Sequence, residues 1–213
     1  MGFRAYNSNF VTSPEVYLFD RGVRDACLLC VALMHMMEGR RLFMNWKALI
    51  REIPDFPQPG ILFRDITPLL GNGVAYRGAI DKLAEFARAQ GAQYVVGPEA
   101  RGYVVGAPLA YALGVGFVPV RKGGKLPART ISVEYGLEYG KDILEVHQDA
   151  LPKGARVVVA DDLLATGGTI SATVNLVQQL GAQVVGAAFL IELTELRGRD
   201  KLTHFAVETL IRF

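Results

Sequence analysis

The chain has 213 residues, of which 51% are hydrophobic and 21% charged, and its formal net charge is +2. These values are typical of one folded domain with a sizeable core rather than of a disordered chain, and the weak charge argues against a nucleic-acid surface. No uninterrupted apolar run is long enough to cross a bilayer, and the two cysteines, Cys27 and Cys30, form no disulfide framework. We therefore expect a cytoplasmic protein that binds neither nucleic acid nor membrane.

The sequence divides at Met44 into an N-terminal extension, residues 1–43, and a domain, residues 44–213. The extension mixes polar and apolar residues without a sustained period, so we expect it to be dispensable, and Met44 could itself be an initiator. Two other interpretations remain open. Cys27 and Cys30 could bind a metal or act as a redox pair, although no further cysteine completes a zinc site. Residues 27–37 could instead form an amphipathic docking segment.

The first half of the domain mixes helices, short strands and loops. A short helix is predicted over Trp46–Ile53, and the three prolines of Pro54–Gly60 make that stretch a loop, because each removes a backbone donor and fixes φ. Ile61–Phe63 then reads as a short extended run. The later elements that we expect are a helix over Val74–Gln90 stopped by Gly91, a strand at Tyr94–Val96, a buried helix at Gly102–Leu113, a strand at Phe117–Val120 and a long loop over Lys122–Gly140.

The second half contains the strongest strand pattern, Arg156–Ala160, which we expect Asp161 and Asp162 to end. The neighbouring elements that we expect are a strand at Asp142–Val146, a helix at Thr169–Leu180 stopped by Gly181, and a final strand at Val184–Leu193. Strands that are continuous apolar runs and alternate with helices predict an α/β fold, with a central, mostly parallel sheet flanked by helices.

One segment, Val157–Thr169, carries the clearest chemistry. A buried strand runs into Asp161 and Asp162, and a short loop of small and hydroxylated residues, Ala165–Thr169, leads into a helix. Backbone amides at a helix N-terminus bind phosphate, and glycines let the backbone approach an anion closely. Two carboxylates beside a phosphate make sense if they accept hydrogen bonds from ribose hydroxyls, directly or through a Mg²⁺-bound water. The plain alternative is a strand–turn–helix junction with ordinary capping residues.

This segment resembles the signature of the type I phosphoribosyltransferases, and the chain resembles most closely the adenine enzymes among them. Four further stretches support the resemblance: residues 56–66, 99–102, 121–127 and 137–141. They follow the family's order at similar spacing, and the resemblance covers Met44 to about Thr209. It implies the type I fold with a small N-terminal hood over the base site and a mobile flap. It also implies a homodimer that joins adenine to 5-phosphoribosyl pyrophosphate (PRPP), giving AMP and pyrophosphate.

The resemblance also implies roles for single residues. The residues implied to bind PRPP are Ala165, Thr166, Gly167, Gly168 and Thr169 at the 5-phosphate, Asp161 and Asp162 at the ribose hydroxyls, Arg101 and Lys122 at the pyrophosphate, and Lys125 at the start of the flap. Leu62 and Arg64 would frame adenine through their main chain, Phe63 would stack on the ring, and Glu138 would lie near the base nitrogen that exchanges a proton. Arg101 and Glu138 are the catalytic candidates. Mg²⁺ is the implied cofactor, held mainly by PRPP rather than by the protein.

Some residues depart from the family or permit a plainer interpretation. The chain has Glu134-Tyr135 where many type I relatives carry Ser-Tyr in the flap. Phe63 could be simple core, and Arg64 could form a surface ion pair with Asp65. Two other functions stay open: transfer to another base, such as xanthine, hypoxanthine or orotate, and a PRPP-sensing regulator that binds nucleic acid. The mixed charges of residues 1–43 argue against that regulator.

Overall fold

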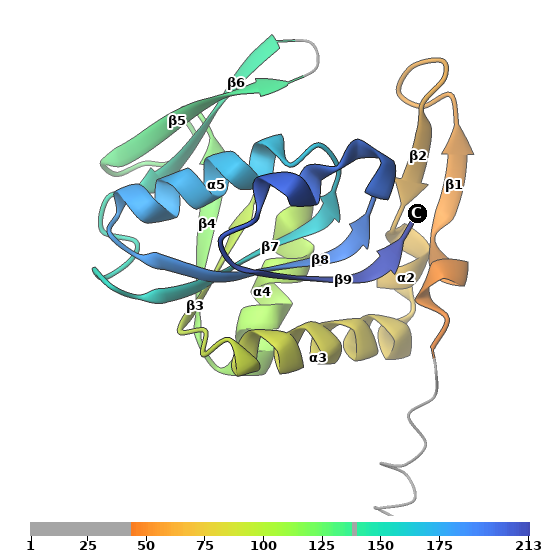
Figure 1. Ribbon diagram of the computed structural model, residues 1–213, viewed down its shortest axis with the longest axis horizontal. Coiled ribbons are helices and arrows are strands. Elements are labelled where there is room, and N and C mark those ends of the chain that lie inside the picture. Colours follow the sequence, from red (N-terminus) through yellow and green to blue (C-terminus); the bar gives the residue numbers. More distant parts are fainter. Residues whose placement is uncertain (1–43, 138–139) are drawn as a thin grey trace, which may run out of the picture. The chain divides into compact units, whose positions relative to one another are not determined.

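The computed structural model describes residues 44–137 and 140–213, and Figure 1 shows their arrangement. A seven-stranded sheet has the strand order β5-β6-β4-β3-β7-β8-β9. Its strands are β3 (Tyr94–Pro98), β4 (Gly116–Lys122), β5 (Thr130–Leu137), β6 (Gly140–His147), β7 (Arg156–Leu164), β8 (Gln183–Glu192) and β9 (Ala206–Arg212). Neighbours from β4 to β9 pair in parallel, whereas β6 pairs antiparallel with both β4 and β5. The predicted mostly parallel α/β sheet is therefore confirmed.

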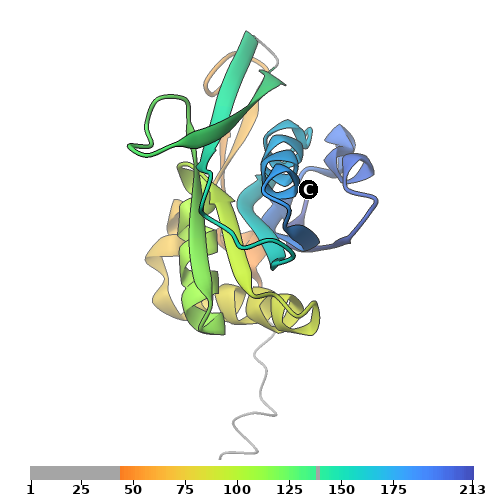
Figure 2. The ribbon, with the colours of Figure 1, turned by 90° about the vertical axis from the view of Figure 1, so that its left-hand side faces the viewer.

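Helices cover both faces of this sheet, as Figures 1 and 2 show. The helices are α2 (Thr67–Gly71), α3 (Gly73–Ala89), α4 (Arg101–Leu113) and α5 (Gly168–Gln179), with short 3₁₀ turns η1 (Trp46–Leu49), η2 (Thr194–Leu196) and η3 (Gly198–Lys201). In β7, Val158 and Ala160 belong to the core that contains α3 and α4, and Val157 and Val159 belong to the core that contains α5. Because successive side chains of a strand point to opposite faces, a continuous apolar run is what a strand buried on both faces requires.

A separate two-stranded antiparallel sheet, β1 (Arg51–Pro54) and β2 (Leu62–Asp65), forms the hood that the sequence predicted. The predicted helix over Trp46–Ile53 is only partly right, because the helical turn ends at Leu49 and β1 begins at Arg51. Pairing with β2 provides backbone partners that a short isolated helix would lack, and the proline-containing loop connects the two strands.

The predicted long loop over Lys122–Gly140 is wrong, since β5 and β6 form an antiparallel hairpin there. Ile131, Val133 and Tyr135 pack against the core on the α5 side and alternate with Ser132 and Glu134, which is the period of a half-buried strand. The glycines of this stretch obscured that alternation in the sequence.

Three further features differ from expectation: the end of β7, the last strand of the sheet and the burial of α4. The acidic pair does not end β7, which continues in register with β8 as far as Leu164, because ladder bonds use backbone groups whatever the side chain. Val184–Leu193 is not the final strand, since β9 adds to the sheet in parallel with β8. Helix α4 buries one side only, and its Tyr111 is 90% exposed. No helix in the described part of the chain is long and apolar enough to cross a membrane.

Candidate active site

A cleft of about 200 Å³ lies at the carboxyl ends of β3 and β7 and is lined by residues 99–101 and 161–170. The two strands are parallel neighbours, so their carboxyl ends meet at one edge of the sheet. After β3 the chain passes through α4 to β4 on one side, and after β7 it passes through α5 to β8 on the other. Open α/β sheets bind ligands at such a reversal of strand order.

The predicted phosphate loop, Ala165–Thr169, forms one wall of this cleft. Gly167 is the N-cap of α5 and has a φ of 77°, a left-handed conformation that glycine adopts without a Cβ penalty. Glycine has no side chain that could cap the helix, so the first-turn amides of α5 lie at a cleft suited to an anion. The structure therefore brings these five residues together where the sequence placed them.

The acidic pair, Asp161 and Asp162, also lines this cleft. The Asp162 side chain is only 4% exposed, and one of its oxygens lies 3.3 Å from Nε of Arg101. Burial, together with the charge of Asp162, raises the pKa of the Asp161 carboxyl well above its ordinary value. Burial also raises the pKa of Asp162, although the Arg101 guanidinium opposes the shift. Both carboxyls line the cleft, where a ligand hydroxyl could donate a hydrogen bond to them.

Arg101 connects the cleft to the hood. It is the first residue of α4, and its guanidinium carbon lies 5.5 Å from the centre of the Phe63 ring. Phe63 in turn packs edge-to-face with Phe56, with ring centres 5.1 Å apart. The half-buried Phe63 ring lies beside the Arg101 guanidinium, so it is placed to stack on a flat ligand next to the cleft.

The two neighbours of Phe63 on β2 lie differently. Leu62 is 44% exposed, whereas the Arg64 side chain is 14% exposed and pairs with Glu52 across the β1–β2 pair. The suggested ion pair between Arg64 and Asp65 is wrong, because adjacent residues of a strand point to opposite faces. Asp65 instead pairs with Arg51, at 2.7 Å.

Lys122 and Lys125, which the sequence predicted to contact pyrophosphate, are not among the described residues that line the cleft. Each pairs with a carboxylate instead. Nζ of Lys122 lies 2.8 Å from Asp142, and Nζ of Lys125 lies 2.5 Å from Glu99. Glu99 also binds Arg121, at 2.8 Å, and its side chain is 7% exposed. Burial alone would raise the pKa of Glu99, but the hydrogen bonds from Lys125 and Arg121 lower it below its ordinary value.

Glu99 and Tyr135 stand in stretches that the sequence singled out, but the sequence assigned neither residue a role. Glu99 lines the cleft, and the available signal was its place directly after a buried strand and two residues before Arg101. Burial raises the pKa of Tyr135, and a hydrogen bond with Thr169 opposes this rise, so strand β5 touches the start of α5. Glu138 lies outside the described residues, and its role stays a prediction.

Comparison with known proteins agrees with this geometry. A family model described as the phosphoribosyl transferase domain matches residues 73–210. An adenine phosphoribosyltransferase of Brevibacillus brevis is 59% identical over 170 residues, which cover 80% of this chain and 100% of the relative. The adenine phosphoribosyltransferase structure from Thermoanaerobacter pseudethanolicus has a TM-score of 0.76 at 56% identity, covering 78% of this chain and 97% of that one. The Saccharomyces cerevisiae enzyme, solved with adenine and an imino-altritol bisphosphate, has a TM-score of 0.73 at 41% identity, covering 78% of this chain and 96% of that one. The chain therefore belongs to the adenine phosphoribosyltransferase family.

Proposed function

We propose that this protein transfers the 5-phosphoribosyl group of PRPP to adenine, giving AMP and pyrophosphate, in purine salvage. The observation that carries this proposal is one cleft in which a phosphate loop, the two adjacent carboxyls of Asp161 and Asp162, and Arg101 meet, with Phe63 of the hood beside Arg101. A phosphate site, a hydroxyl-binding pair and a flat aromatic platform match the three parts of the product nucleotide.

In the proposed reaction, N9 of adenine forms a bond to C1′ of the ribose as the bond from C1′ to the pyrophosphate oxygen breaks. The electron pair of the broken bond leaves with pyrophosphate, and the N9 proton passes to the solvent or to Glu138. Arg101 stabilises the negative charge that develops on the leaving group. Asp161 and Asp162 hold the ribose hydroxyls and stabilise the positive charge that develops on the sugar. The amides of Ala165–Thr169 fix the 5-phosphate, so that C1′ and the base meet in one orientation.

The lysines are proposed to exchange partners during turnover. Lys122 and Lys125 bind Asp142 and Glu99 in the free protein. Pyrophosphate carries more negative charge than either carboxylate and can compete for both ammonium groups. The β5–β6 hairpin and the turn that begins at Gly123 would then close over the cleft and exclude water, which would otherwise attack C1′.

The donor set of the cleft fits the implied Mg²⁺. Magnesium prefers oxygen ligands, keeps several waters and is usually bound by one or two carboxylates together with substrate phosphates. Asp161 and Asp162 supply carboxylate oxygens beside the phosphate loop. Mg²⁺, when bound, would neutralise charge on the pyrophosphate. The resemblance to the family further supports a homodimer located in the cytoplasm.

Base choice tests the proposal directly. Purified protein with PRPP and Mg²⁺ should convert adenine far faster than hypoxanthine, guanine, xanthine or orotate. Hypoxanthine turnover comparable to that of adenine would contradict the assignment.

The phosphate assignment has its own test. Gly168→Val should abolish or strongly weaken PRPP binding, because the bulky side chain blocks access to the amides, while circular dichroism shows an intact fold. Unchanged PRPP affinity would place the phosphate elsewhere.

A further inference from the structure

The phosphate loop is supported from behind by a segment that the proposed reaction does not use. Gly198, the first residue of η3, is buried, and its backbone lies directly against the loop before α5. A Cβ added at Gly167 would lie 2.8 Å from the carbonyl oxygen of Gly198. A Cβ added at Gly198 would overlap the carbonyl oxygen of Ala165 and lie 2.9 Å from the amide nitrogen of Gly167. The two segments therefore meet backbone to backbone, with no room for a side chain.

The two glycines are required for different reasons. Gly167 has a φ of +77°, so its backbone conformation alone favours glycine. The φ of Gly198 lies outside the left-handed region, so any residue could adopt its backbone conformation. What excludes a side chain at Gly198 is the phosphate loop itself, since the obstructing atoms are backbone atoms of Ala165 and Gly167, which cannot rotate away.

The residue after Gly198 anchors this segment to the sheet. Arg199 donates two hydrogen bonds to Glu192, at 2.8 and 2.6 Å, in the bidentate arrangement that fixes a guanidinium most firmly. Arg199 also donates to the carbonyl oxygen of Val207, at 2.9 Å, and to the hydroxyl of Thr209, at 3.1 Å. Thr209 completes the network by donating to Glu192, at 2.9 Å.

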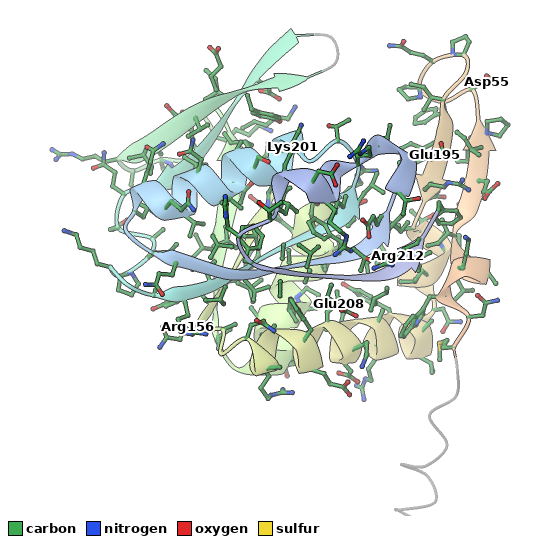
Figure 3. The ribbon with its side chains drawn as sticks, viewed as in Figure 1. Asp55, Arg156, Glu195, Lys201, Glu208 and Arg212 are labelled. Atoms are coloured by element: carbon green, nitrogen blue, oxygen red, sulfur yellow. The ribbon has the colours of Figure 1, made fainter. Side chains whose placement is uncertain are left out.

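This network joins three elements at one point. Glu192 is the last residue of β8 and is 7% exposed at its side chain, whereas Val207 and Thr209 belong to β9. In Figure 3 the labels Glu195 and Lys201 mark the segment that contains Gly198, and Arg212 lies on β9. Both strands belong to the rigid sheet, so the position of Gly198 is set by the sheet rather than by the loop that it touches.

We propose that Gly198, held by the Arg199–Glu192–Thr209 network, is a positioning residue that fixes the phosphate loop in the conformation that binds the 5-phosphate. The inference rests on the proposed function, because it presumes that Ala165–Thr169 receive that phosphate. Loop amides bind an anion only when they converge, so a displacement of Ala165 and Gly167 weakens the site without touching the substrate.

The first test replaces Gly198 with alanine. Gly198→Ala should raise the KM for PRPP and the inhibition constant of AMP together, by roughly 10- to 100-fold, because both ligands carry the 5-phosphate. The inhibition constant of pyrophosphate, which lacks that group, should stay unchanged. Gly73→Ala is the matched control, since a Cβ there meets nothing within 4 Å. Its constants should equal those of the unmodified protein.

The second test leaves Gly198 in place, in case the alanine variant fails to fold. Arg199→Lys and Glu192→Gln should show the same selective loss, because neither variant keeps a bidentate ion pair. The control is Arg197→Ala, which removes the neighbouring ion pair with Asp200, in which Arg197 is 79% exposed.

Two results would overturn the inference. One is that Gly198→Ala, Arg199→Lys and Glu192→Gln all keep the KM for PRPP and the inhibition constant of AMP of the unmodified protein. The other is that these variants lose as much affinity for pyrophosphate as for AMP. Either result, with Gly168→Val still losing PRPP, would leave the proposed function intact. Failure of the unmodified protein to convert adenine would contradict the proposed function instead.

Discussion

At the scale of single residues, the cleft holds charges that only partly compensate each other. Asp162 is buried, and one of its carboxylate oxygens lies 3.3 Å from Nε of Arg101, which is half-exposed. Burial and mutual repulsion raise the pKa of Asp161, and burial raises that of Asp162. Ionised carboxylates accept hydrogen bonds from ribose hydroxyls better than neutral ones do. The binding of PRPP should therefore depend on pH at values above those at which an ordinary aspartate titrates.

This dependence predicts the direction of a pH profile. As pH falls through the raised pKa of the pair, protonation removes acceptors, so the KM for PRPP should rise on the acid side. In Asp162→Asn the KM should be higher at every pH, but its acid limb should shift to lower pH, because the loss of the Asp162 charge lowers the pKa of Asp161. The measurement is the KM for PRPP between pH 5 and 8. An acid limb that moves to higher pH in this variant would contradict the account.

Glu138 provides a second prediction at this scale. If its carboxylate takes the base proton or orients the base, Glu138→Ala should lower kcat more than it weakens PRPP binding. General acid–base groups typically contribute about 10²–10⁴-fold. Glu138→Gln keeps the size without the charge and separates proton transfer from orientation. A near-normal kcat in the alanine variant would reduce Glu138 to a flap residue without catalytic function.

At the scale of elements, the side chain of Phe213, directly after β9, connects the hood to the seven-stranded sheet. The Arg64 guanidinium of β2 lies 3.8 Å from the centre of the Phe213 ring, and the Lys47 ammonium lies 4.2 Å from it. The Phe213 backbone is itself fixed, because its carbonyl accepts hydrogen bonds from Thr194, at 2.9 and 2.7 Å. Phe213 thus connects the strand that carries Phe63 to the segment beside the phosphate loop.

Removal of this ring should loosen the base site selectively. An exposed cation–π contact contributes about 0.5–1 kcal/mol, so Phe213→Ala should raise the KM for adenine by roughly two- to fivefold, with the KM for PRPP nearly unchanged. Phe213→Tyr keeps an aromatic face and serves as the control. A larger change in the KM for PRPP than for adenine would show that Phe213 acts on the phosphate side instead.

At the scale of the whole molecule, the sheet order places the site. The reversal between β3 and β7 sends α4 and α5 to opposite faces, so the loops after both strands remain free at one edge of the sheet. The described residues that line the cleft all lie after Met44 in the sequence. We propose on this basis that residues 44–213 form the phosphoribosyltransferase domain and that residues 1–43 are not needed for catalysis.

A chain that begins at Met44 tests the proposed division. Its kcat, melting temperature and oligomer size, measured by light scattering, should equal those of the full chain, because the described residues that line the cleft and form both cores all follow Met44. Loss of activity or of a dimer would refute dispensability. Attention would then turn to the apolar run 27–37 as a docking segment.

The sequence alone determined those parts of the site whose residues follow one another along the chain. The apolar run of β7, the acidic pair and the loop to α5 follow one another in Val157–Thr169, and each step has a local physical cause: burial on two faces, carboxylate chemistry, and glycine beside a helix N-terminus. Glu99-Ala100-Arg101 and Leu62-Phe63-Arg64 were likewise found as short contiguous stretches.

Tertiary structure alone decided which distant residues meet. Nothing near Lys125 indicates that Glu99 binds it, and nothing near Gly167 indicates that Gly198 lies against its backbone. The alternation in β5 and the apolar residues of β9 could be recognised as strands only once β6 and β8 were seen to pair with them. Local propensity is a property of neighbours along the chain, whereas ion pairs, edge strands and backbone contacts depend on neighbours in space, and the fold must exist before those neighbours are defined.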